Sequence, residues 1–189
     1  MSRFLVVFDV DSTLIQDEFI ELLAEEAGKR TEVAAITDAA MRGELDFSES
    51  LKARVATLAG LPESVIQATL DRVRLTPGAE QLIAHIHSIG GLVGAVSGGF
   101  TQILSPLAER LKLDFHLANQ LGVSDAELTG LVDGPIIDKS AKAAALKQWA
   151  EQSGLSTENT TAVGDGANDL QMMSSAGLGV AFNAKPIVR

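Results

Sequence analysis

The stretch Phe4-Leu5-Val6-Val7-Phe8-Asp9-Val10-Asp11-Ser12-Thr13 decides the fold of this 189-residue chain. Residues 4–8 are apolar, which predicts a strand that is buried on both faces, as in a parallel sheet. Asp9 and Asp11 follow at once, and because side chains alternate along extended backbone, we expect both carboxylates on one side. Ligands bind at the carboxyl ends of parallel strands, so the pair predicts a functional site, although an isolated Asp-x-Asp is as often a polar turn.

The rest of the chain divides into a helical segment and an alternating segment. Helical patterns cover 17–28, 31–41, a third stretch from a cap at Asp46 or Ser48 to Gly60, and 62–73. After Thr76 the patterns predict helices over 79–89, 100–111, 141–153 and 168–176, and strands over 92–96, 115–123, 128–132, 160–163 and 178–182. This order predicts an α/β fold with a doubly wound, mostly parallel sheet. We expect residues 1–15 and 76–189 to form its core and residues 16–75 a small helical-bundle cap inserted after the first strand.

Composition excludes several classes of protein. The formal net charge is −10 and the chain has seven Phe, one Trp and no Tyr, which argues against a nucleic-acid partner. No apolar run approaches the roughly 18 residues that cross a bilayer, so we expect no membrane partner. Cysteine is absent, which excludes disulfides and thiolate metal sites. Met1-Ser2-Arg3 leads straight into the first strand without a signal sequence, and we expect a cytoplasmic protein.

Two further strands end in residues that can carry chemistry. Ser97-Gly98-Gly99 follows the strand 92–96, and a hydroxyl beside glycine N–H groups suits a phosphate, although such a sequence is more often a flexible loop. Residues 164–169, Gly-Asp-Gly-Ala-Asn-Asp, follow the strand 160–163. Asp165 and Asp169 lie about one turn apart there, and with Asp9 and Asp11 they predict a cluster of hard oxygen ligands that suits Mg²⁺. The alternative for this segment is a solvated turn that caps a helix.

Lys142 stands out among the basic residues. It follows a possible N-cap at Ser140 and shares a helix face with Leu146 and Trp149, at i+4 and i+7. A lysine on a buried face needs an anionic partner, unless it only covers apolar surface with its stem.

In this order, the motifs resemble those of the haloacid dehalogenase-like phosphatases, and among them the group that hydrolyses phosphoserine. The matching segments are residues 9–14, residues 96–100, Lys142 and residues 163–169. The resemblance implies a Rossmann-like fold and Mg²⁺-dependent hydrolysis of L-phosphoserine through an aspartyl-phosphate. It implies that Asp9 is the nucleophile and Asp11 the general acid and base. Phosphate would be bound by Ser97, Gly98, Lys142 and Asn168, and the metal by Asp9, Asp11, Asp165 and Asp169.

The resemblance extends into the helical segment, where this family selects its substrate. It implies that Glu18 receives the substrate ammonium, that Arg54 receives its carboxylate, and that Met41 and Phe47 provide apolar cover. From residue chemistry alone, Asp17, Glu21 and Glu25 are equal candidates for the ammonium, and Arg54 reads equally well as part of a solvated helix face. Two other functions stay open. One is a phosphatase of the same family for another small phosphomonoester. The other is a phosphate-accepting receiver domain, although receivers carry adjacent acidic residues and have no helical insert.

Overall fold

The computed structural model of the protein describes residues 4–41, 44–184 and 186–188. It contains a six-stranded sheet with the order β4-β3-β2-β1-β5-β6, in which every neighbouring pair is parallel except the β3–β4 hairpin. The strands are β1 (Leu5–Phe8), β2 (Leu92–Phe100), β3 (Phe115–Ser124), β4 (Glu127–Asp133), β5 (Thr160–Gly164) and β6 (Leu178–Ala181). The predicted α/β fold with a mostly parallel sheet is therefore confirmed.

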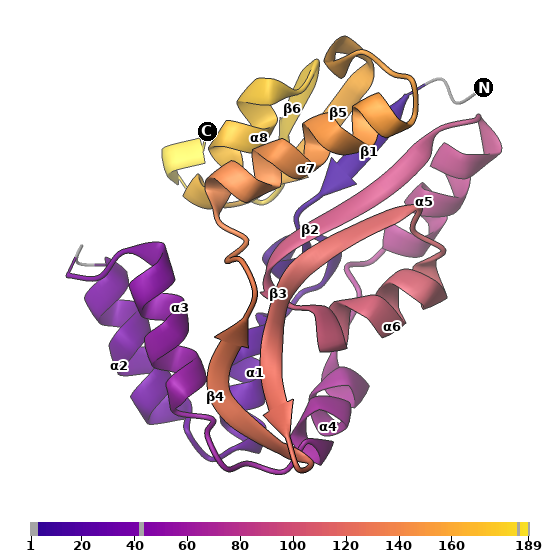
Figure 1. Cartoon of the computed structure of the whole chain (residues 1–189). Coiled ribbons are helices and arrows are strands. Elements are labelled where there is room, and N and C mark those ends of the chain that lie inside the picture. The colour runs from indigo at the N-terminus through magenta and orange to yellow at the C-terminus, as the bar shows by residue number, and fades with distance from the viewer. Residues whose placement is uncertain (1–3, 42–43, 185, 189) are drawn as a thin grey trace.

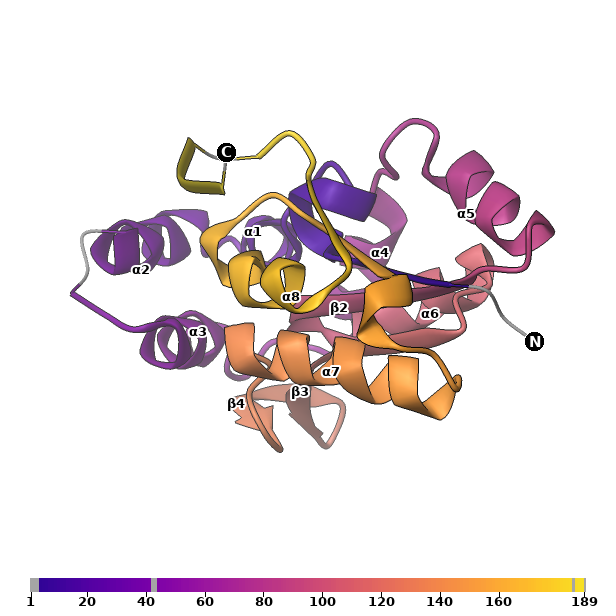
Figure 2. The ribbon, with the colours of Figure 1, turned by 90° about the horizontal axis from the view of Figure 1, so that it is seen from above.

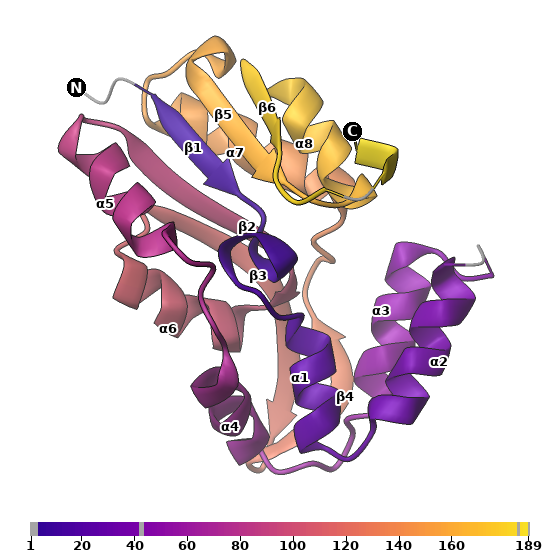
Figure 3. The same cartoon turned by 180° about the vertical axis from the view of Figure 1, so that it is seen from behind.

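Helices cover both faces of the sheet, as the apolar first strand requires. On one face lie α5 (Ala79–Ser88) and α6 (Thr101–Leu111), and on the other lie α7 (Lys139–Gln152) and α8 (Leu170–Ser175), as Figures 1 and 3 show from opposite sides. All four residues of β1 are buried. Val6 and Phe8 belong to the core beneath α5 and α6, whereas Leu5 and Val7 belong to the core beneath α7. Because successive side chains of β1 point to opposite faces of the sheet, this one strand contributes to the cores on both faces.

The helical segment between β1 and α5 does not form one closed bundle. Its helices are α1 (Phe19–Glu26), α2 (Arg30–Met41), α3 (Phe47–Ala56) and α4 (Ser64–Arg72). The α2 and α3 helices lie side by side and extend away from the sheet, whereas α1 packs on α4 (Figures 1 and 2). The β3–β4 hairpin reaches into this part of the molecule, where β4 packs against α3 and its Leu128 accepts a hydrogen bond from Gly60 N at 2.8 Å. The sequence predicted the helices but not this partner, because the contact joins segments about seventy residues apart.

The two ends of the helical segment leave the sheet together. Thr76 N donates to Leu14 O and Gln16 N donates to Arg74 O, both at 2.9 Å, and Ile15 and Leu75 pair as an antiparallel bridge. The Asp17 carboxylate adds an ion pair with the Arg74 guanidinium at 2.5 Å. Because both connections are tied to each other directly after β1, the helices are held at the edge of the sheet where the strands end.

Two local predictions were wrong in detail. The β2 strand does not stop at Val96 but runs on to Phe100, with a shift in its register against β3 between these residues. Ser140 is not the N-cap of α7; the helix begins two residues earlier than predicted, and the Asp138 carboxylate accepts hydrogen bonds from Ser140 N and Ala141 N. A carboxylate is an equally good N-cap, and it complements the positive end of the helix dipole. Within the part of the chain that the structure describes, no helix is long and apolar enough to cross a membrane.

Candidate active site

A cavity of about 440 Å³ lies where the carboxyl end of β2 and the loops after β1 and β5 face the α2–α3 pair. Its walls come from both parts of the chain. The strand end and the loops contribute Asp9, Asp11, Gly98, Gly99, Asp165, Ala167 and Asn168, and the helical segment contributes Glu18, Ile20, Thr37, Ala40, Leu45, Phe47, Ser50, Leu51 and Arg54. The carboxyl ends of three parallel strands therefore form the floor of the cavity, as the position of the motifs predicted.

The loop after β1 is a tight turn over Val10–Leu14. Asp9 remains extended and its amide donates to Val163 O of β5 at 2.8 Å, which continues the sheet pairing up to the carboxylate. Ser12 adopts a left-handed backbone conformation with φ of 57°, and the turn closes with a hydrogen bond from Ile15 N to Val10 O at 3.0 Å. This turn places the Asp9 and Asp11 carboxylates in the same cavity.

Lys142 lies at the centre of a buried charge cluster. Its Nζ donates to Asp9 Oδ1 at 2.5 Å and to Asp169 Oδ1 at 2.8 Å, and the lysine side chain is only 1% exposed. Burial lowers the pKa of Lys142, but the carboxylates of Asp9 and Asp169 act more strongly in the opposite direction, and the pKa is raised overall. The sequence predicted an anionic partner for this lysine, and the structure shows two.

Three carboxylates of the cluster can hold a cation. Oxygen atoms of Asp9, Asp165 and Asp169 lie within 4.8 Å of one another, and all three residues are buried. Burial raises the pKa of Asp9, Lys142 opposes the rise, and the charges of Asp169 and Asp11 add to it, so that the pKa is about 8 overall. An excess of buried negative charge with only oxygen donors fits a hard divalent cation, which would favour the ionised carboxylates.

Asp11 lies beside this cluster with different partners. Its Oδ1 accepts a hydrogen bond from Phe19 N at 2.7 Å, and its Oδ2 accepts one from the Ser97 hydroxyl at 2.8 Å. Burial raises the pKa of Asp11, while the two hydrogen bonds and the charge of Lys142 oppose the rise. A raised pKa favours the protonated carboxyl, which is the form that can donate a proton.

The carboxyl end of β2 around Ser97 is held by buried hydrogen bonds. Ser97 Oγ accepts from Gly99 N at 2.7 Å while it donates to Asp11. Asn119 of β3 is fully buried, donates from Nδ2 to Gly98 O at 2.8 Å and accepts at Oδ1 from Ile137 N at 2.7 Å. The sequence did not predict Asn119, because β3 also contains His116 and Gln120 and no pattern marks this amide as the buried one. Asn119 ties the end of β2 to the segment that leads into α7 and Lys142.

The loop after β5 needs its glycines for close packing. A Cβ atom at Gly164 would lie 2.5 Å from the Cβ of Asp169, so a side chain at this position would displace that residue. Gly166 N donates to Asp169 Oδ2 at 3.0 Å, so that Asp169 accepts from both the lysine and the backbone. Asn168 lines the cavity beside Asp165.

Glu18 and Arg54 also line the cavity. Glu18 precedes α1 and accepts a hydrogen bond from the Ser12 hydroxyl at 2.7 Å, so its carboxylate lies beside the turn that carries Asp11. Arg54 on α3 donates its Nε–H to Ser50 O at 3.2 Å. Burial lowers the pKa of Arg54, and the charges of Glu18, Asp11 and Glu21 oppose this effect. An anionic and a cationic side chain of the helical segment therefore share one cavity with Asp9 and Asp11.

The structure separates Glu18 from the other acidic candidates of its segment. Asp17 pairs with Arg74, Glu25 pairs with Arg72 and Arg30, and Glu21 is exposed outside the cavity lining. Phe47 lines the cavity at the first turn of α3, where a Cβ atom at Gly98 would lie 3.1 Å from its ring. The Met41 side chain lies outside the described part of the structure, so its role stays a prediction. Of the predicted site residues, the structure brings together at this cavity Asp9, Asp11, Glu18, Phe47, Arg54, Gly98, Asp165 and Asn168. Ser97 and Lys142 do not line it but contact Asp11 and Asp9, and Asp169 contacts Lys142.

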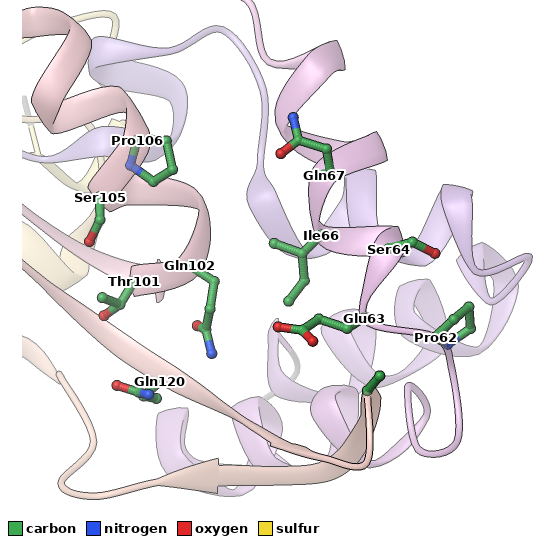
Figure 4. Close-up of a pocket in the computed structure, with 11 residues that line it drawn as sticks. Pro62, Glu63, Ser64, Ile66, Gln67, Thr101, Gln102, Ser105, Pro106 and Gln120 are labelled. Carbon is green, nitrogen blue, oxygen red and sulfur yellow. The ribbon is translucent and has the colours of Figure 1, made fainter.

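A second depression, of about 780 Å³, lies between α4, α6 and the β3–β4 hairpin (Figure 4). It differs from the first cavity because several of its polar side chains are hydrogen bonded to the neighbouring strand β3. Thr101 donates to Ala118 O, Gln102 exchanges two hydrogen bonds with Leu121, and Ser105 contacts His116. Glu63 is the one carboxylate among its lining residues. The chemistry-bearing groups are therefore concentrated in the smaller cavity.

Comparison with known proteins agrees with this geometry. The family model of the haloacid dehalogenase-like hydrolases matches residues 6–174. The chain is 57% identical over 185 residues to phosphoserine phosphatase SerB2 of Mycobacterium tuberculosis, covering 98% of this chain and 45% of that protein. It is 53% identical to the phosphoserine phosphatase of Streptococcus thermophilus, covering 98% of this chain and 86% of that protein.

Among solved structures, a phosphoserine phosphatase described as a phospho-aspartyl intermediate analogue superposes with a TM-score of 0.92 at 43% identity, covering 100% of this chain and 90% of that one. The chain spans about half the length of the Mycobacterium tuberculosis relative and most of the length of the Streptococcus thermophilus one. The match of the family model over most of the chain, together with these similarities, shows that the chain belongs to the haloacid dehalogenase-like hydrolase family.

Proposed function

We propose that the protein hydrolyses L-phosphoserine to serine and phosphate, with Mg²⁺ as cofactor and an aspartyl-phosphate as intermediate. One observation carries the proposal. A single cavity is lined by Asp9 and Asp11, beside a buried lysine–carboxylate cluster, and also by Glu18 and Arg54. Phosphoserine has a phosphate at one end and an ammonium and a carboxylate at the other, so the charged groups around this cavity complement both ends of the substrate. The similarity to phosphoserine phosphatases over 98% of the chain supports the same substrate.

In the first half of the proposed reaction, a carboxylate oxygen of Asp9 attacks the phosphorus atom of the substrate. The bond between phosphorus and the serine oxygen breaks, and Asp11 donates its proton to that oxygen. The raised pKa of Asp11 supports this role, since it favours the protonated form before the transfer. Serine leaves, and the phosphoryl group remains bonded to Asp9.

In the second half, Asp11 acts as a base. It removes a proton from a water molecule, whose oxygen attacks the phosphorus atom and releases phosphate from Asp9. The Asp11 side chain is held in place by Phe19 N–H and the Ser97 hydroxyl, which is the arrangement that both proton transfers require. The two transfers together return Asp11 to its protonated starting state after one turnover.

Other residues of the floor would hold the phosphoryl group. Lys142, the Gly98 N–H, the Ser97 hydroxyl and Asn168 provide donors to its oxygens, and Asp9, Asp165 and Asp169 with the Asp11 carbonyl provide ligands for Mg²⁺. When bound, the cation lowers the repulsion between the Asp9 carboxylate and the anionic phosphate. Without it, the burial of several carboxylates around one lysine opposes the approach of an anion.

Residues 16–75 would act as a cap that selects the substrate. Glu18 would bind the ammonium, Arg54 the carboxylate, and Phe47 with Met41 would cover the apolar part. The division of the chain into this cap and a core of residues 1–15 and 76–189 is supported by the paired connections at its two ends. An arginine is suited to the carboxylate because its guanidinium can donate two parallel hydrogen bonds.

A panel of phosphomonoesters tests the proposal. We expect phosphate release from L-phosphoserine to exceed that from 3-phosphoglycerate, which has a hydroxyl in place of the ammonium, and from phosphoethanolamine, which has no carboxylate. Excess chelator should abolish release and Mg²⁺ should restore it. Equal rates on all three esters would rule out the proposed specificity, and full activity in chelator would rule out the proposed cofactor.

A further inference from the structure

Ser12 has a backbone conformation that its residue type does not favour. Its φ of 57° lies in the left-handed region, where a residue with a Cβ atom is strained and glycine is not. The position lies between Asp11 and the connection to α1, inside the turn that carries both catalytic aspartates. A strained residue at such a place calls for a compensating contact of its side chain.

That contact is the hydrogen bond to Glu18. Ser12 Oγ donates to Glu18 Oε1 at 2.7 Å, and the two residues are six positions apart. Glu18 occupies the N-cap position of α1, but its side chain does not cap the helix. The Glu18 carboxylate therefore does not accept a hydrogen bond from the first backbone N–H groups of α1. It is instead directed to the turn after β1, where it lines the cavity.

The neighbouring residue anchors the same helix from the same turn. Asp11 Oδ1 accepts from Phe19 N at 2.7 Å, so Asp11 and Ser12 hold two consecutive residues at the start of α1. The backbone contact of Asp11 fixes the helix end, whereas the Ser12 contact fixes the position of the Glu18 carboxylate. The two tasks are thus divided between adjacent side chains.

We infer that Ser12 is a positioning residue for substrate selection, because its hydroxyl holds the Glu18 carboxylate at the place where the substrate ammonium binds. This role rests on the proposed function. Ser12 does not need to touch the substrate, and it adds no charge to the cavity. It restricts the rotamers of a flexible glutamate and so lowers the loss of conformational entropy when the ammonium binds.

Two substitutions separate this role from a structural one. Ser12→Ala removes the hydroxyl, and Ser12→Gly removes it and also relieves the strained backbone. We expect both to lower kcat/KM for L-phosphoserine by roughly ten-fold, mainly through a higher KM, since a hydrogen bond to a charged acceptor is lost. The rate with 3-phosphoglycerate should change less than about two-fold, because that ester has no ammonium to position. The melting temperature of Ser12→Gly should be equal to or above that of the unmodified protein.

Lys112→Gly is the matched control for backbone relief. Lys112 has the same φ of 57°, is exposed at the end of α6 and lies outside the cavity lining. The Lys112→Gly variant should have a melting temperature equal to or above that of the unmodified protein. Its kinetics on both esters should be unchanged. A double-substitution cycle completes the test: in a Glu18→Gln background, Ser12→Ala should cause little further loss.

The results that overturn the inference differ from those that overturn the proposed function. Equal losses on both esters, or no loss on either, would show that Ser12 serves the fold or nothing at all, while the function would stand. Additive losses in the double-substitution cycle would show that Ser12 acts independently of Glu18. If the unmodified protein itself shows no preference for L-phosphoserine over 3-phosphoglycerate, the proposed function fails, and the role of Ser12 fails with it.

Discussion

Replacement of Lys142 by methionine tests the energetic role of the buried charge cluster. Met has a similar length and shape to the lysine stem but carries no charge, so the substitution removes one positive charge that is shared by Asp9 and Asp169. Both carboxylates then remain buried without the ammonium. Removing one partner from a buried ion pair costs about 3–5 kcal/mol. That is a large part of the roughly 5–15 kcal/mol by which a domain is stable.

The loss of stability in Lys142→Met should depend on pH, and the direction of that dependence follows from the pKa of Asp9. The pKa of Asp9 is about 8 in the folded protein, above its value of roughly 3.9 in an unfolded chain. A raised pKa means that this group favours folding at low pH and that the contribution is lost as the pH rises through the folded value. Protonation also removes the unpaired charge that the substitution leaves behind. We therefore expect the Lys142→Met loss to be smaller at pH 5 than at pH 8 and above.

Urea unfolding followed by tryptophan fluorescence measures this loss directly. Trp149 is the only tryptophan of the chain, is buried, lies on the same helix as Lys142 and stacks on Phe115 with ring centroids 5.4 Å apart. Mg²⁺ should stabilise the variant more than the unmodified protein, because no ammonium competes with the cation for the carboxylates. Lys147→Met is the matched control, since Lys147 is exposed on the same helix and its loss should stay within about 0.5 kcal/mol. A Lys142→Met loss below about 1 kcal/mol at pH 8, or equal losses at pH 5 and pH 8, would refute the reasoning.

Three further predictions address the reaction and the connection to the cap. Asp9→Asn keeps the shape but removes the attacking oxyanion, so turnover measured by phosphate release should fall at least about 10³-fold. Arg54→Ala and Glu18→Ala should each lower kcat/KM for phosphoserine by about 2–4 kcal/mol but change hydrolysis of p-nitrophenyl phosphate far less; equal losses would assign both residues to the fold. Partial burial raises the pKa of Asp17, but the Arg74 guanidinium outweighs it and the pKa is lowered, so this ion pair should stabilise the protein above about pH 4 and be lost on acidification. Asp17→Asn should remove about 1 kcal/mol at pH 7 and nothing near pH 2, as measured by urea unfolding.

The sequence by itself determined the fold class and the floor of the site. Apolar runs that end in Asp9 and in residues 164–169 predicted parallel strands, and such strands bring their carboxyl ends to one edge whatever the details of packing. The spacing of Lys142 to Leu146 and Trp149 predicted a lysine on a buried face. The family resemblance then selected Glu18 and Arg54 as substrate-binding residues. Residue chemistry alone could not distinguish Glu18 from the other acidic residues of its segment, or Arg54 from a residue of a solvated helix face. The fold class is confirmed, and the sequence could predict it because local periodicity and strand order contain it, whereas the roles of Glu18 and Arg54 stay predictions.

The tertiary structure decided which of several similar residues meet in the cavity. Only in the folded chain do Asp17 and Glu25 turn to arginines while Glu18 lines the cavity. The Asn119 contact to Gly98 and the packing of the β3–β4 hairpin on α3 likewise join segments that are distant in sequence. The hydrogen bond from Ser12 to Glu18 depends on a left-handed backbone at a serine, which no propensity favours. Local preferences are weaker than the burial of paired charges and amides, so these contacts are settled by long-range packing and cannot be derived from sequence spacing.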